Sequence, residues 1–301
     1  MHIKIGSRKS KLALWQSRHV AELLQLDGHT TEIIELTSEG DEVLDKPLTS
    51  IGGKGVFTKA LDHAILNGEI DIAVHSFKDI PTQLLGGLEL GAILERENPA
   101  DVIVCRKGLD FLNSTKGVVA TSSNRRKSQW LHRYPKHEIV DIRGNVQTRI
   151  EKLKASDWDA AVFAAAGLIR LELEHEIGMT LDWMVHAPAQ GAIAVVYASG
   201  KEYLRTSLQI LHHKDTAICT LSEREFLNEL NGGCAVPVGA KVYIIDNEIF
   251  FNGIVLNSNG TQKIEIALHR SLNNAEGIGI EAAKIALDRG AYKLISSAHN
   301  G

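Results

Sequence analysis

Polar and basic side chains follow four strand-like segments of the sequence, directly after each segment ends. They supply hydroxyl groups, lysine and, in three of the four places, arginine; the groups are 6–8 (GSR), 75–79 (HSFKD), 121–126 (TSSNRR) and 143–145 (RGN). In open α/β sheets, ligands bind beyond the carboxyl ends of the strands, where arginines and helix N-termini bind carboxylate or phosphate. A single arginine there would be typical of a solvated surface, but the coincidence of four groups predicts a polyanionic ligand in a cleft.

Two further residues are candidates for acid–base or covalent chemistry. Asp79 is the one acid among these strand-end groups, and its carboxylate could stabilise a cationic intermediate, transfer a proton or pair with a neighbouring arginine. Cys234 follows Gly232 and Gly233 and precedes Pro237, which indicates a loop. On its own, this setting is equally compatible with a tight turn and with a reactive thiol.

The segment GGKG (52–55) places Lys54 among glycines. It lacks the G-x-x-x-x-G-K-[ST] pattern that cradles nucleotide phosphates, because Gly55 follows the lysine. Two interpretations remain open, namely a mobile basic lid and an ordinary flexible loop.

Composition narrows the class of protein. A formal net charge of −4 argues against a general nucleic-acid binder, and no apolar run is long enough to span a membrane. The opening MHIKIGSRKSKLAL lacks the apolar region of a secretory signal, so we expect a cytoplasmic protein. Cys105 and Cys219 lie in apolar or helical segments and are interpreted as packing residues. The histidines lack metal-ligand spacing, so no metal site is predicted.

Strand-like and helix-like segments alternate over the first two hundred residues, which is typical of α/β architecture. The polar segment at 95–101 and the segment at 185–192 could be two crossings between lobes. After about residue 214, a helical stretch, three segments with period-two alternation and another helix indicate a small α+β domain. We therefore predict two α/β lobes with mixed, mainly parallel sheets and a C-terminal domain with a three-stranded antiparallel sheet. The predicted boundaries are 1–95 with 190–210, 100–186, and 214–301.

A series of stretches, in this order and spacing, resembles the porphobilinogen deaminase (hydroxymethylbilane synthase) family. They are GSRKSKLAL (6–14), GDEVLDKPL (40–48), GGKGVFTKAL (52–61), DIAVHSFKDIPT (71–82), ATSSNRRKSQ (120–129), IRGNVQTRI (142–150), AAAGLIRL (164–171), APAQGA (187–192) and SEREFLNELNGGCAVPVGA (222–240). The resemblance implies two lobes like those of periplasmic binding proteins and a third domain with the cysteine. It also implies a monomer that acts on a small molecule, without a nucleic-acid or membrane partner.

The implied reaction joins four porphobilinogen molecules head to tail, with release of ammonia, into the linear tetrapyrrole hydroxymethylbilane. The implied primer is a dipyrromethane cofactor held by a thioether to Cys234. Since each unit adds an acetate and a propionate, the growing chain is a polyanion, which fits the arginine-rich strand ends. Asp79 matches the family's catalytic aspartate, which would stabilise positive charge on the pyrrole nitrogens.

Further site residues follow from the resemblance, position by position. Those matched to cofactor binding are Ser10, Lys78, Asp79, Thr121, Ser122, Ser123, Arg125, Arg126, Arg143, Gly144, Gln190 and Cys234. Those matched to substrate binding are Arg8, Arg143, Arg149 and Arg170, with Lys54 and Lys59 of a segment over the cleft. The competing interpretations are a non-catalytic anion-binding protein and a phosphate-transfer enzyme.

Overall fold

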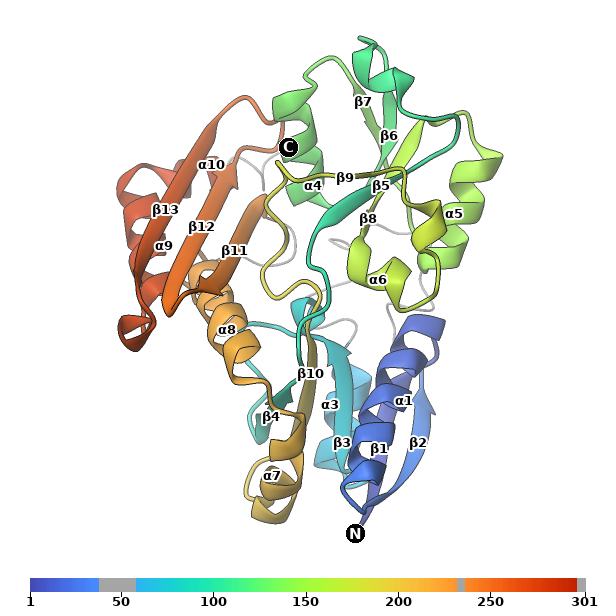
Figure 1. Cartoon of the computed structure of the whole chain (residues 1–301), viewed down its shortest axis with the longest axis vertical. Helices are drawn as coiled ribbons and strands as arrows, with labels where there is room; N and C mark the ends of the chain where they lie inside the picture. Colours follow the sequence, from blue (N-terminus) through green and yellow to red (C-terminus); the bar gives the residue numbers. More distant parts are fainter. Residues whose placement is uncertain (38–57, 232–235, 297–301) are drawn as a thin grey trace. The chain divides into compact units, whose positions relative to one another are not determined.

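The computed structural model describes residues 1–37, 58–231 and 236–296 (Figure 1). The chain divides into two compact units, Met1–Glu97 with Gly191–Ala217 and Asn98–Gln190 with Ile218–Gly301. The candidate residues Lys54 and Cys234 lie outside the described residues. None of the helices built from the described residues combines the length and hydropathy needed to cross a membrane.

The first unit is built on a five-stranded sheet in the order β2-β1-β3-β10-β4. Strands β1, β2 and β3 are mutually parallel, whereas β10 runs antiparallel to both β3 and β4. The strands are β1 (His2–Arg8), β2 (Thr30–Leu36), β3 (Ile72–Ser76), β4 (Leu88–Ile93) and β10 (Ile193–Ala198), and the helices are α1 (Lys11–Leu26), α3 (Lys59–Leu66), η2 (Phe77–Asp79), α7 (Glu202–Leu208) and η5 (Gln209–Leu211).

Helices cover both faces of this sheet. Val20 and Leu24 of α1 and Leu204 of α7 join one apolar core with Ile5 of β1. On the other face, a Cβ at Gly6 would meet Leu61 of α3 at 2.8 Å, so the absence of a side chain lets α3 pack closely. Helix α1 begins directly after Ser10, whose side chain caps it.

The α/β part of the second unit has a sheet in the order β7-β6-β8-β5-β9. Strands β6, β7 and β8 are parallel, and β5 runs antiparallel to β8 and β9. The strands are β5 (Asp101–Cys105), β6 (Val118–Ala120), β7 (Glu138–Val140), β8 (Ala160–Ala164) and β9 (Met179–Thr180), and the helices are η3 (Asp110–Asn113), α4 (Asn124–Arg133), α5 (Val146–Ala155), α6 (Ala165–Ile169) and η4 (Glu174–Glu176).

The two five-stranded sheets share one topology. In each sheet, the second of the parallel strands along the chain lies at the edge, the first lies beside it, and the third comes next. The fourth position is occupied by a strand that runs antiparallel to its neighbours. In each sheet that fourth strand follows a crossing segment: β5 begins at the last residue of 95–101, and β10 begins directly after 185–192. The predicted pair of α/β lobes with mixed, mainly parallel sheets is confirmed. The exact domain boundaries stay a prediction.

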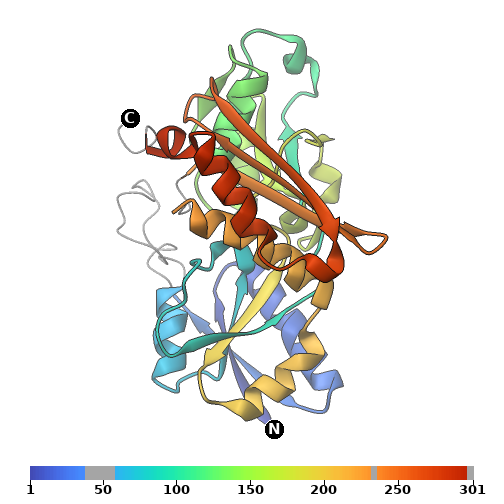
Figure 2. The same cartoon turned by 90° about the vertical axis from the view of Figure 1, so that its left-hand side faces the viewer.

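The C-terminal part carries the predicted three-stranded antiparallel sheet, in the order β11-β12-β13. Its elements are α8 (Lys214–Glu229), β11 (Val238–Ile245), β12 (Glu248–Leu256), β13 (Lys263–Ser271), η6 (Leu272–Asn274), α9 (Ile278–Asp288) and α10 (Ala291–Ser296). Figure 2 shows α9 and α10, in red, on one face of this sheet. Phe226 of α8 and Phe251 of β12 pack edge to face in the shared core, with ring centroids 5.3 Å apart.

Candidate functional site

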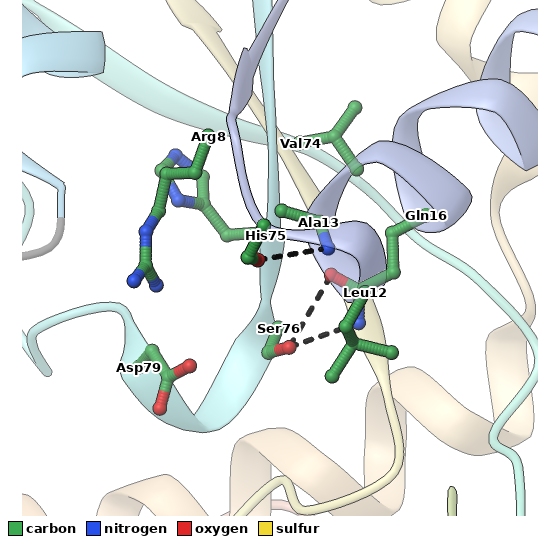
Figure 3. Close-up of a pocket in the computed structure, with 9 residues that line it drawn as sticks. Arg8, Leu12, Ala13, Gln16, Val74, His75, Ser76 and Asp79 are labelled. Carbon is green, nitrogen blue, oxygen red and sulfur yellow. Dashed lines mark hydrogen bonds between the residues drawn. The ribbon is translucent and has the colours of Figure 1, made fainter. Parts of the chain in front are cut away.

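A pocket of about 70 Å³ lies in the first unit, where β1 and β3 end and α1 begins (Figure 3). It is lined by Arg8, Ser10, Leu12, Ala13, Gln16, Val74, His75, Ser76 and Asp79. The pocket lies at the carboxyl ends of parallel strands, which is the position where ligands bind in such sheets. Three predicted site residues, Arg8, Ser10 and Asp79, therefore share one cavity.

Arg8 and Asp79 place opposite charges at this pocket. Arg8 is the last residue of β1, and Asp79 ends the short helix η2 that follows β3. Both side chains are half-buried, and Figure 3 shows the Arg8 guanidinium extending toward the side of the pocket where the Asp79 carboxylate lies. One cavity thus offers a cation, Arg8, that can bind a ligand carboxylate, and an anion, Asp79, that can stabilise developing positive charge.

Polar side chains at the start of α1 line the same cavity. The Ser10 side chain accepts a hydrogen bond from the Ala13 backbone N–H at 3.3 Å. The Gln16 amide nitrogen donates to the Ser76 hydroxyl at 2.9 Å, and that hydroxyl lies 3.3 Å from the Gln16 carbonyl oxygen, as the dashed lines of Figure 3 show. Gln16 and Ser76 were not predicted as site residues. Ser76 belongs to the strand-end group HSFKD, whereas Gln16 carries no signal in the sequence.

His75 also belongs to the strand-end group HSFKD and was not predicted individually as a site residue. Only 5% of it is exposed, and its Nε2 has no hydrogen-bond partner among the described residues. Burial, with a smaller contribution from the positive charge of Arg8, lowers the pKa of His75 from its ordinary 6.5 to about 4. The imidazole is therefore neutral at physiological pH, and it adds no second positive charge beside Arg8.

The low pKa of His75 predicts an acid-dependent loss of stability. Below pH 6.5 His75 binds a proton in the unfolded chain, whereas in the folded chain it stays unprotonated down to about pH 4. The free energy of unfolding therefore falls as the pH is lowered through that window. The full shift corresponds to a loss of up to about 3 kcal/mol. Urea unfolding at several pH values should show a smaller loss in His75→Gln than in the wild type. Equal pH dependence of the two proteins would contradict the assignment.

In the second unit, the predicted hydroxyl residues surround the start of α4. The Ser123 side chain caps α4 by accepting from the Arg126 backbone N–H at 3.4 Å, and Thr121 Oγ1 accepts from the Ser123 N–H at 3.2 Å. The Ser122 hydroxyl donates to the Ile142 carbonyl at 2.9 Å and accepts from the Ile142 N–H at 3.0 Å. These bonds hold the chain after β6 beside the chain after β7.

Arg125 and Arg126 are buried, with 5% and 7% exposed, and their guanidiniums pair with Asp101. Burial alone would raise the pKa of Asp101, but the two guanidiniums and a hydrogen bond from Gln190 hold it far below its usual range. Asp101 was not predicted as a site residue. Its only sequence signal is an acid at the start of the apolar strand DVIVC.

Gln190 is also buried, and its amide donates to the Pro99 carbonyl at 2.8 Å and to Asp101 Oδ1 at 3.1 Å. The preceding residue, Ala189, has a left-handed φ of 60°, which is costly for a residue other than glycine. Its backbone N–H donates to the buried Glu223 carboxylate at 2.7 Å. This bond helps to fix the turn that presents Gln190.

The remaining candidates lie near the start of α5, at the end of α6, at the start of α3 and in η2. Gly144 has a φ of 116°, and its carbonyl accepts from Arg149 Nε at 2.8 Å. Arg170 follows α6 and is buried, and Arg143 is half-buried. Lys59 is exposed at the start of α3, and Lys78 is half-buried in η2.

The porphobilinogen deaminase models match two parts of the sequence. The model for the dipyrromethane cofactor binding domain matches residues 3–206, and the model for the C-terminal domain matches residues 217–288. The chain belongs to the porphobilinogen deaminase family. The family's cofactor-binding model thus spans both the pocket at Asp79 and the start of α4.

Individual relatives agree with this assignment. The chain is 39% identical to a porphobilinogen deaminase of Syntrophotalea carbinolica over 300 residues, which cover 98% of this chain and 95% of the relative. It is 41% identical to a porphobilinogen deaminase of a Geobacillus species over 300 residues, covering 97% and 96%. Among solved structures, the methionine binding protein MetQ matches with a TM-score of 0.44 and 13% identity, over 71% of this chain and 91% of that one.

The side chains at the two sites fit the acidic cofactor of the porphobilinogen deaminases. Caps at Ser10 and Ser123 leave further first-turn amides of α1 and α4 directed out of the helix ends. The arginines outnumber the acids among the predicted contacts, as a ligand that carries several carboxylates requires.

Proposed function

We propose that this chain is a hydroxymethylbilane synthase, a transferase that joins four porphobilinogen units head to tail on a dipyrromethane primer. The observation that carries the proposal is the match of the family's cofactor-binding domain over residues 3–206, which contain the Asp79 pocket. The pocket supplies what the reaction needs, since Arg8 can bind a substrate carboxylate and Asp79 can face a cationic centre.

Each addition breaks the C–N bond of a porphobilinogen aminomethyl group and forms a C–C bond to a pyrrole α-carbon. The nitrogen leaves as ammonia, and the proton displaced from the α-carbon balances it. The bound primer supplies the first α-carbon. After four additions, the bond between the primer and the tetrapyrrole breaks, the primer α-carbon regains a proton, and water supplies the hydroxyl group of hydroxymethylbilane. Asp79 acts by holding negative charge near the pyrrole N–H groups while the aminomethyl carbon becomes electrophilic, which lowers the energy of the transition state.

Arg8 orients the substrate within this pocket, and Ser10 contacts the primer in the same pocket. The side chain of Ser10 is held by the Ala13 N–H, and the neutral His75 leaves Arg8 as the local positive charge on that wall. A substrate carboxylate at Arg8 would place the rest of the pyrrole ring in a cavity that the carboxylate of Asp79 also lines.

The primer would be held by the remaining residues predicted to bind the cofactor. The substrate units would be held by the remaining predicted arginines and lysines. For the primer these are Cys234, through a thioether, with Lys78, Thr121, Ser122, Ser123, Arg125, Arg126, Arg143, Gly144 and Gln190; for the substrate they are Arg143, Arg149, Arg170, Lys54 and Lys59. The proposal includes a cytoplasmic monomer without a nucleic-acid or membrane partner.

The proposal is tested by incubating purified protein that carries its primer with porphobilinogen. We expect four porphobilinogen molecules to be consumed for each hydroxymethylbilane formed, with one ammonia released for each unit added. The absorbance of the oxidised product measures the hydroxymethylbilane formed, and an ammonia assay measures the ammonia released. Binding of porphobilinogen without ammonia release would instead support the anion-binding alternative.

A further inference from the structure

Asp101 is a completely buried acid near the predicted primer site. It begins β5, is 0% exposed and receives five contacts from three side chains. Arg125 approaches with Nη1 2.6 Å from Oδ2 and Nη2 3.1 Å from Oδ1. Arg126 contributes Nε at 2.9 Å and Nη2 at 2.8 Å from Oδ1, and Gln190 contributes Nε2 at 3.1 Å from the same oxygen.

The charges in this cluster do not balance. Arg125 and Arg126 bring two positive charges against the one negative charge of Asp101, and among the described residues no second carboxylate pairs with either guanidinium. Their other bonds go to the neutral carbonyls of Val185 and Val162. A buried net charge is costly unless it is compensated, so the cluster is suited to receive one further anion.

The position of the cluster connects it to the predicted primer site. Arg125 and Arg126 are the second and third residues of α4, so holding their guanidiniums also holds the first turn of that helix. Ser123 caps the same turn, and Arg125 Nε, which is buried, has no hydrogen-bond partner among the described residues. The cluster therefore combines surplus positive charge, an unused buried donor and a fixed helix start.

We infer that Asp101 is a positioning residue for primer binding. It holds the Arg125 and Arg126 guanidiniums in place and reduces their joint charge from two to one, so that they complement a single carboxylate of the ligand. The inference rests on the proposed function, because the carboxylate is assigned to the dipyrromethane primer. The alternative is that Asp101 only stabilises the fold of the second unit.

Two substitutions separate position from charge. Asp101→Glu keeps the negative charge but moves the carboxylate by about 1.5 Å, whereas Asp101→Asn removes the charge with little change of shape. Asp159→Asn is the matched control, because Asp159 lies in the same α/β sheet region and accepts a backbone N–H from Val118 at 2.8 Å. The readouts are intact mass, which gives primer occupancy of the folded fraction, and the melting temperature.

We expect primer occupancy to fall about tenfold or more in both Asp101 variants. In Asp101→Glu the displaced carboxylate weakens an oriented contact, and in Asp101→Asn the two buried guanidiniums lose the charge that holds them. Porphobilinogen added to primer-free Asp101→Glu should load it only at correspondingly higher concentration. Asp159→Asn should retain wild-type occupancy, whatever its melting temperature. A merely structural Asp101 would lower the melting temperature and leave occupancy of the folded fraction unchanged.

Three results would overturn the inference. Wild-type occupancy in folded Asp101→Glu would show that charge without position suffices, and wild-type occupancy in Asp101→Asn would show that the charge is not needed. Failure of both variants to fold would make Asp101 a folding residue. Failure of the proposed function would be seen separately, as absent porphobilinogen turnover in the wild type and in Asp159→Asn.

Discussion

Replacing Asp79 by asparagine is expected to lower kcat by about 100- to 1,000-fold, while the protein still carries its primer. The substitution preserves the size of the side chain and removes its negative charge. Because that charge is proposed to act on positive charge that develops during the reaction, its loss affects the transition state more than the ground state. Substrate KM should therefore change much less than kcat.

Single-turnover measurements on protein of verified intact mass test this expectation. Asp71→Asn is a suitable control, since Asp71 lies in the same unit and accepts the Lys4 N–H at 2.9 Å away from the pocket lining. The control should turn over normally. Near-normal turnover in primer-loaded Asp79→Asn would remove Asp79 from the mechanism.

Replacing Cys234 by serine is expected to abolish the covalent primer. A serine hydroxyl is a far weaker nucleophile than a thiolate, so no stable thioether equivalent should form. The intact mass of Cys234→Ser should equal that of the bare chain, whereas wild-type protein should exceed its chain mass by one dipyrromethane. Turnover of porphobilinogen should be lost together with the primer.

Cys105→Ser provides the matched control for this experiment. Burial, together with the nearby Asp159 carboxylate, raises the pKa of Cys105 to about 11, so this thiol stays protonated and unreactive at neutral pH. The control should keep both the added mass and the turnover. An adduct that survives in Cys234→Ser, or disappears in Cys105→Ser, would place the attachment elsewhere.

The elements of the fold were largely readable from local patterns. The helical stretch predicted after about residue 214 became α8. The period-two segments after residue 237 became β11, β12 and β13. The antiparallel direction of β5 and β10 was not predicted individually, because periodicity reports that a segment is a strand but not which remote strand it pairs with.

The candidate site was only partly readable in the same way. Arg8, Ser10 and Asp79 were predicted and line one pocket, because strand ends converge at one edge of a parallel sheet. Asp101 was missed and His75 was named only as a member of the strand-end group 75–79, since the significance of both depends on burial and on neighbours distant in sequence. A single acid at the start of an apolar run, such as Asp101, gives no indication of the charges packed against it.

The fourth position of the first sheet has a consequence for how the chain is made. Strand β10 lies between β3 and β4, so β4 reaches its neighbour only after β5 to β9 have been synthesised. Until then, a nascent chain that has emerged through β4 presents β3 with an open edge, and open edges are templates for association between chains. We expect ribosome-bound intermediates ending before β10 to depend on chaperones, and those extending past it to resist proteolysis.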